Sequence, residues 1–115
     1  MTDLQTDYAS NTSIAQAAKW LTGTGPVAIT THFKPDGDAV GSSLALARTL
    51  TRIDPARPVE LWYAGALPDF LAEIAGDTPT RHLDTNPPTE TDHPDTLVIV
   101  DTGSWPQLEF VRDAG

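Results

Sequence analysis

Residues 27–50 read VAITTHFKPDGDAVGSSLALARTL, and this stretch decides the fold. It opens with a short apolar, β-branched run over 27–31, which is typical of a buried strand. A polar turn with Gly and Pro follows over 32–38, and a helical pattern begins at Ala39. Two adjacent stripes carry the helical period: Val40, Leu44 and Ala47, then Leu46, Leu50 and Ile53. The stretch therefore predicts a strand, a turn and a helix in succession.

The same alternation continues toward the N-terminus. A helix is predicted on Ile14, Ala17, Ala18 and Leu21, with Thr12 or Ser13 as its cap and Gly23 and Gly25 at its end. Residues 1–11 form a polar leader, and residues 12–115 form one domain, because 115 residues are too few for two ordinary ones.

The alternation also continues toward the C-terminus. Residues 59–63 predict a strand, and 69–75 predict a short helix with Phe70, Leu71 and Ile74 inward and Gly76 as its stop. A brief strand is expected at 81–83, an apolar strand covered on both faces at 96–100, and a helix at 105–111. The predicted fold class is α/β, three-layered with a mostly parallel sheet, because strands alternate with helices.

Composition restricts the chemistry. The absence of cysteine leaves His, Asp and Glu as the metal ligands. A formal net charge of −9 disfavours binding to duplex nucleic acid, yet it allows a short phosphorylated ligand held through a cation. Neither a membrane-spanning run nor a signal peptide occurs, so we expect a cytoplasmic chain without a membrane partner.

Four side chains that suit a hard cation follow two of the predicted strands. His32, Asp36 and Asp38 come after 27–31, and Asp101 comes after 96–100. The carboxyl ends of parallel strands meet at one edge, so these groups are expected together, although each alone is more often a turn or cap residue. Three carboxylates would repel one another without a cation, and Mn²⁺ or Mg²⁺ suits this donor set. Two cations about 4 Å apart would support hydrolysis of a phosphoester or phosphoanhydride.

Other residues receive secondary interpretations. Gly37 is expected to bend the turn between the two aspartates, and Gly41, Ser42 and Ser43 to lie at the helix start, where free N–H groups favour an anion. Other residues are interpreted without a role in the site. Lys34 is a solvated loop charge, and His82 and His93 are loop residues. The three tryptophans are core or core-edge residues: Trp20, Trp62 and Trp105.

Residues 29–42, ITTHFKPDGDAVGS, resemble the first signature of the DHH phosphoesterase superfamily, and residues 97–101, LVIVD, resemble the second. The form Pro-Asp-Gly-Asp-Ala-x-Gly-Ser is similar to the branch of bifunctional oligoribonucleases and pAp phosphatases (nano-RNases). The resemblance implies a two-manganese site in which His32 and Asp36 bind the first ion, Asp38 the second, and Asp101 bridges both. Asp36, Asp38 and Asp101 would then be the catalytic carboxylates, with Mg²⁺ as the alternative metal.

The resemblance also implies a substrate. The full-length enzyme would hydrolyse short oligoribonucleotides or the 3′-phosphate of adenosine 3′,5′-bisphosphate (pAp), and its homodimerisation is left open. The Asp-His-His signature and the DHH-associated domain do not occur before Gly115, so the chain resembles an N-terminal fragment. We expect an exposed apolar sheet edge, weak metal binding and little hydrolysis by these residues alone.

Three alternatives stay open at this point. One is another DHH enzyme that acts on a cyclic dinucleotide or polyphosphate. The second is a receiver-like signalling domain with one Mg²⁺, which fits poorly because neither Lys19 nor Lys34 is near a later strand end. The third is a remnant that has lost catalysis.

Overall fold

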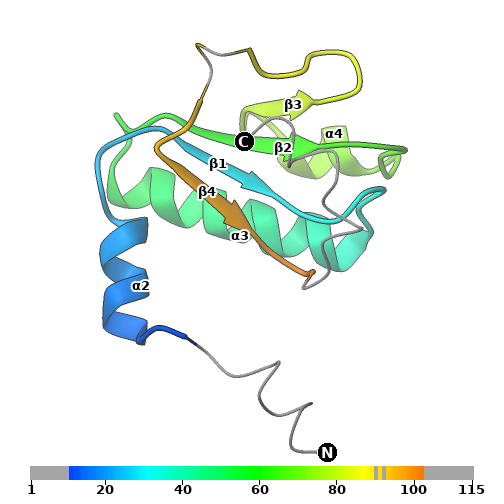
Figure 1. Cartoon of the computed structure of the whole chain (residues 1–115). Helices are drawn as coiled ribbons and strands as arrows, with labels where there is room; N and C mark the ends of the chain where they lie inside the picture. The colour runs from blue at the N-terminus through cyan, green and yellow to red at the C-terminus, as the bar shows by residue number, and fades with distance from the viewer. Residues whose placement is uncertain (1–10, 90, 92, 103–115) are drawn as a thin grey trace, which may run out of the picture.

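A four-stranded parallel sheet forms the centre of the computed structural model, which describes residues 11–89, 91 and 93–102 (Figure 1). The strands are β1 (Val27–Thr30), β2 (Val59–Tyr63), β3 (Thr80–His82) and β4 (Thr96–Ile99), and their order is β3-β2-β1-β4. All three pairings are parallel, and Val27 of β1 lies between Val59 and Thr96. The predicted α/β class with a parallel sheet is confirmed. The predicted helix at 105–111 and nearly all of the leader lie outside the described residues.

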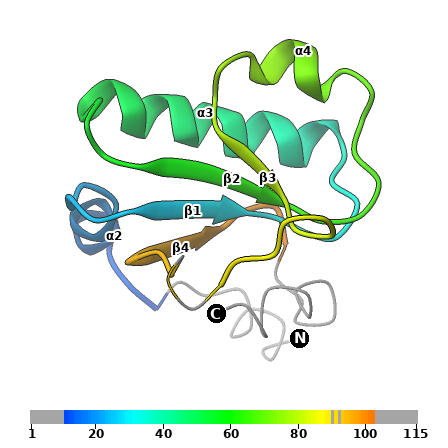
Figure 2. The same cartoon turned by 90° about the horizontal axis from the view of Figure 1, so that it is seen from above.

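The core lies between the sheet and helix α3 (Gly37–Ile53). Figure 2 shows α3 and α4 on one face of the sheet, and α2 at the end where the strands begin. Four residues of the predicted helical stripes are buried, namely Val40, Leu44, Ala47 and Leu50. Facing them are the alternate strand residues Val27, Ile29, Val59, Leu61 and Tyr63. Ile53 was predicted to share this face, but it is the last residue of α3 and is 61% exposed.

Helix α3 begins two residues before the predicted start. Asp36 is its N-cap, and one carboxylate oxygen of Asp36 accepts a hydrogen bond from the Ala39 N–H at 2.9 Å. Gly37 is therefore the first helical residue, and its φ lies outside the left-handed region. The expectation that Gly37 bends a turn is wrong, because Gly37 already belongs to helix α3, which Asp36 caps.

The two shorter helices match the predicted segments but bury less than expected. Helix α2 (Ile14–Leu21) has Ser13 as its predicted cap, yet none of its residues is buried. Helix α4 (Leu71–Ala75) ends at Gly76, whose φ is +58°, as predicted. Phe70 and Ile74, both expected inward, are 42% and 40% exposed, because α4 directs Leu71 and Ala75 to the core.

Strand β4 is less covered than predicted. All four of its residues keep at least intermediate exposure, and Ile99 is 36% exposed. Among the described strands β4 pairs with β1 alone, so it is an edge strand. The expected cover on both faces is therefore not seen in the residues that the structure describes.

Some single-residue interpretations change as well. Trp62 is buried as predicted, whereas Trp20 is 56% exposed on α2, and Trp105 lies outside the described residues. The brief strand predicted at 81–83 is present as β3, and His82 is its last residue, so the interpretation of His82 as a loop residue is wrong. His93 does lie in a loop and is exposed. In the described part of the chain, no helix has the length and apolar character needed to cross a membrane.

Candidate metal centre

His32 follows β1 at the carboxyl end of the sheet, and its side chain is 16% exposed. The ring nitrogen Nδ1 lies 3.0 Å from the backbone carbonyl oxygen of Phe33. A carbonyl can only accept a hydrogen bond, so this contact places the proton on Nδ1. In the neutral imidazole the other nitrogen, Nε2, then presents a lone pair, which is the form that binds a metal.

The Nε2 atom of His32 faces two carboxylates. It lies 3.5 Å from an oxygen of Asp101 and 3.7 Å from an oxygen of Asp36. The candidate ligand atoms of these three residues all lie within 4.8 Å of one another. Ligands of one octahedral cation at about 2.1 Å lie about 3.0 Å apart when adjacent and about 4.2 Å apart when opposite. The spacing and the donor set of one imidazole and two carboxylates therefore fit a divalent cation such as Mn²⁺ or Mg²⁺.

Asp36 is positioned by the start of α3. The oxygen that caps the helix by accepting from Ala39 is the same one that faces His32. The side chain is 65% exposed, so a ligand from solvent can reach it.

Asp101 is positioned by an unusual backbone conformation. The N–H of Val100 donates to the carbonyl of Thr30 at 3.0 Å, which extends the pairing of β4 with β1. Asp101 then turns with a φ of +60°, a left-handed value that few residues other than glycine adopt. Backbone strain of this kind is common at functional sites. Here the turn brings the carboxylate of Asp101 to His32.

Asp38 stands apart from this group. It is exposed in the first turn of α3 and is not among the three residues whose ligand atoms converge. Of the four predicted ligands, the structure thus brings together His32, Asp36 and Asp101 and leaves Asp38 outside.

The segment from Gly41 to Ser43 does not lie at the unpaired N–H groups of the helix start, where it was predicted to be. The Val40 N–H already bonds to the Asp36 carbonyl, so these residues lie beyond the unpaired N–H groups of the helix start. Ser43 is fully buried, and its hydroxyl donates to the Ala39 carbonyl at 2.7 Å and lies 2.5 Å from the hydroxyl of Tyr63. Burial raises the pKa of Tyr63 above 10.0, and the hydrogen bond with Ser43 opposes this rise. Ser43 is a core residue.

A loop contact next to His32 was missed by the sequence reasoning. Lys34 has a φ of +56°, and its N–H donates to the Ala64 carbonyl at 2.9 Å. The adjacent Gly65 has a φ of +84°, and its N–H donates to Asp84 at 3.0 Å. The Nε2 atom of His82 lies 3.0 Å from the Gly65 carbonyl. The one available signal was a glycine just after a predicted strand.

Comparison with known proteins shows the family and the fold of the chain. Residues 26–114 match the family described as DHH family, N-terminal domain. The crystal structure of an exopolyphosphatase-related protein from Bacteroides fragilis matches with a TM-score of 0.74 and 26% sequence identity. The match covers 88% of this chain and 30% of that one, so the chain spans less than a third of the length of its structural neighbour. No curated protein matches the sequence.

Proposed function

Because this chain belongs to the DHH family, we propose that it supplies metal ligands to an enzyme that hydrolyses short oligoribonucleotides or the 3′-phosphate of pAp. DHH phosphoesterases depend on divalent metals and act on phosphorylated nucleotides or polyphosphate. The nano-RNase branch, the substrate and the choice of Mn²⁺ are parts of the proposal. Cytoplasmic location and homodimerisation remain predictions.

One observation carries the proposal: the imidazole of His32 and the carboxylates of Asp36 and Asp101 converge at the carboxyl ends of β1 and β4. In open parallel sheets this edge is the usual place for a ligand. The carboxylates are 65% and 39% exposed, so a substrate can approach them from solvent.

Each residue would have a separate task. His32, Asp36 and Asp101 would hold a divalent cation, which would polarise a phosphoryl oxygen and lower the pKa of a water molecule. The hydrogen bond from His32 Nδ1 to the Phe33 carbonyl keeps Nε2 aimed at the carboxylates. Asp38 is proposed for a second cation, with Asp101 shared between the two.

Polyphosphate is the second candidate substrate. One solved structure that resembles this chain is that of an exopolyphosphatase-related protein. Metal ions can assist the hydrolysis of phosphoanhydride and phosphoester bonds in the same way. The receiver-like alternative does not agree with the family match. Since the sequence holds no Asp-His-His triplet, we expect little or no hydrolysis by these residues alone.

The test measures Mn²⁺ binding and hydrolysis in the same preparations. We expect Asp36→Asn and Asp101→Asn to weaken Mn²⁺ binding at least tenfold, because each removes a charged ligand. Asp69→Asn is the matched control, since Asp69 is an exposed carboxylate outside the converging group. We expect Asp38→Asn to remove the second of two bound ions.

Phosphate release from pAp and from tripolyphosphate, with Mn²⁺ present, then ranks the two substrates. The proposal is wrong if the wild-type chain binds Mn²⁺ no more tightly than Asp101→Asn.

A further inference from the structure

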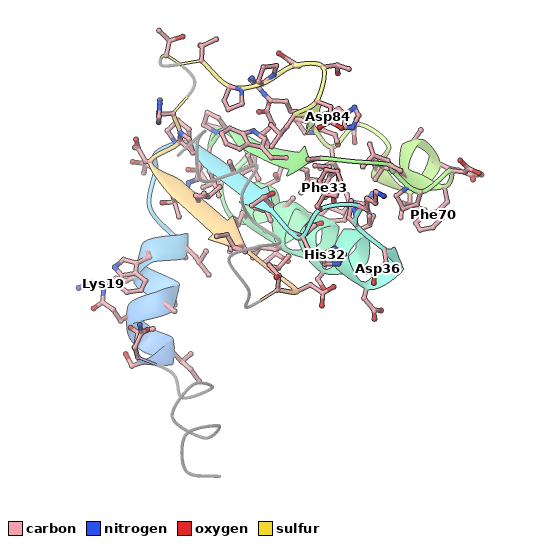
Figure 3. The ribbon with its side chains drawn as sticks, turned by 45° about the vertical axis from the view of Figure 1, so that its right-hand side comes forward. Lys19, His32, Phe33, Asp36, Phe70 and Asp84 are labelled. Carbon is pink, nitrogen blue, oxygen red and sulfur yellow. The ribbon has the colours of Figure 1, made fainter. Side chains whose placement is uncertain are left out.

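Two exposed aromatic rings lie beside the candidate metal centre. Phe33, which directly follows His32, is 45% exposed, and Phe70 is 42% exposed. The Cζ atom of Phe70 lies 3.9 Å from the position that a Cβ would take at Gly37, next to Asp36. Figure 3 shows both rings at the same end of the sheet as His32 and Asp36, whereas Lys19 lies on α2, away from them.

The positions of these rings differ from those of the other large apolar side chains that are exposed in the described part. Ile14 and Trp20 lie on α2, Ile53 ends α3, and Ile74 is on α4. Ile99 ends β4 near Asp101, but it carries no aromatic ring. Phe33 and Phe70 instead flank two groups that would hold a cation. An aromatic ring can stack on any nucleobase, whereas an inorganic polyphosphate offers it nothing to stack on.

Lys34 adds a positive charge to this surface. Its ammonium nitrogen lies 5.8 Å from the centre of the Phe33 ring, within range of a cation–π interaction. The backbone of Lys34 is tied to Ala64, and its Cγ packs against Gly65, where an added Cβ would come within 2.8 Å. In a chain with a net charge of −9, a cation beside a proposed phosphate site gives local complementarity to an anion.

We infer that Phe33, Lys34 and Phe70 bind the nucleoside phosphate part of the substrate. The two rings contact the base, and Lys34 pairs with a phosphate. This inference rests on the proposed function and deepens it, because it selects a nucleotide over polyphosphate as the ligand of the same site.

The test compares two ligands on the chain by NMR titration, with Mg²⁺ as the diamagnetic cation. The ligands are pAp, which has a base, and tripolyphosphate, which has none. We expect Phe33→Ala and Phe70→Ala each to raise the Kd for pAp about five- to tenfold, as the loss of a stacking contact does. Their Kd values for tripolyphosphate should stay within about twofold of wild type, whereas Lys34→Met should weaken both ligands.

Trp20→Ala is the matched control, because it removes an exposed aromatic ring from α2. The inference is overturned if the Phe variants bind pAp as tightly as Trp20→Ala, or if they weaken both ligands equally, which indicates a structural role. It is also overturned if the wild type binds Mn²⁺ but not pAp, or if the rings prove to pair two copies of the chain. Absence of Mn²⁺ binding, or an unchanged Mn²⁺ affinity in Asp36→Asn, instead contradicts the proposed function on which it rests.

Discussion

The two ends of the parallel sheet are built in opposite ways. At the amino end, prolines stand directly before β1, β2 and β3, and their carbonyls accept hydrogen bonds from neighbouring strands. Arg57 is buried there and donates to the carbonyls of Leu21 and Gly25. At the carboxyl end, Lys34, Gly65 and Asp101 have positive φ values. Backbone carbonyls at the amino end are thus hydrogen-bonded, while the carboxyl end has left-handed backbone and exposed carboxylates. Residues that stabilise the fold and residues suited to bind a ligand therefore lie at opposite ends of the strands.

Among the substitutions considered, Arg57→Ala is expected to lower the free energy of unfolding the most. Its guanidinium Nε donates to the Gly25 carbonyl at 2.7 Å, and Arg57→Ala would leave two carbonyls without that partner. We expect the free energy of unfolding to fall by about 3 kcal/mol, since hydrogen bonds from a buried charged group are strong. Urea denaturation measures the loss, and Arg52→Ala, an exposed arginine on α3, is the control. An equal effect of both variants would mean that the amino end does not stabilise the fold in this way.

A methyl group at Gly65 tests how rigid the carboxyl end is. The added Cβ of Gly65→Ala would lie 2.8 Å from the Lys34 Cγ and 3.0 Å from its backbone nitrogen, at a φ of +84°. We expect a loss of about 2 kcal/mol in the free energy of unfolding, from steric and backbone strain together. Gly41 lies within α3, and no atom lies within 4 Å of the position that an added Cβ would take. Gly41→Ala should therefore stabilise the chain by about 0.5 kcal/mol. Losses of similar size in both variants would contradict this assignment.

Tyr63 allows a test by pH. Because burial raises its pKa above 10.0, the neutral phenol contributes stability that is complete below pH 10 and is lost as pH rises through the raised value. Tyr63→Phe should cost about 1 kcal/mol at pH 8, the contribution of one hydrogen bond. The variant should then lose less stability than wild type between pH 8 and pH 11. A parallel fall in Tyr63→Phe and wild type would exclude Tyr63 as the titrating group.

The smallest expected effect is that of Asp101→Asn on stability without metal. Its oxygen lies 3.5 Å from His32 Nε2, and the side chain is 39% exposed, so the pair should contribute little. We expect the free energy of unfolding to change by less than about 0.5 kcal/mol in chelator. Added Mn²⁺ should raise the Tm of wild type but not of the variant. A loss of stability as large as that of Arg57→Ala would remove the distinction between the two ends.

Much of the fold could be predicted because it depends on local patterns. The apolar runs predicted β1 and β2, and helical spacing predicted the buried face of α3. The exposure of Phe70, Ile74 and Ile99 could not be predicted, since it depends on which element packs against each segment. Local pattern says where an apolar side chain lies along its element, but not whether a neighbour covers it.

The candidate site was predictable in its members but not in its geometry. Their positions after two parallel strands predicted that His32, Asp36 and Asp101 would meet. Asp38 lies in the first turn of α3, which begins two residues earlier than predicted, and its ligand atoms are not part of the group. The left-handed backbone of Lys34 and Asp101 depends on loop dihedrals that no spacing specifies. The role of these residues as metal ligands stays a prediction.

The pairing of β4 with β1 has a consequence for the order of folding. Thr30 and Ile99 are neighbours in the sheet although a long segment of chain separates them. During synthesis His32 and Asp36 emerge well before Asp101, so the three-residue group cannot close until β4 has emerged and joined the edge of β1. The rate at which a refolding chain binds Mn²⁺ would therefore report the rate at which β4 pairs with β1.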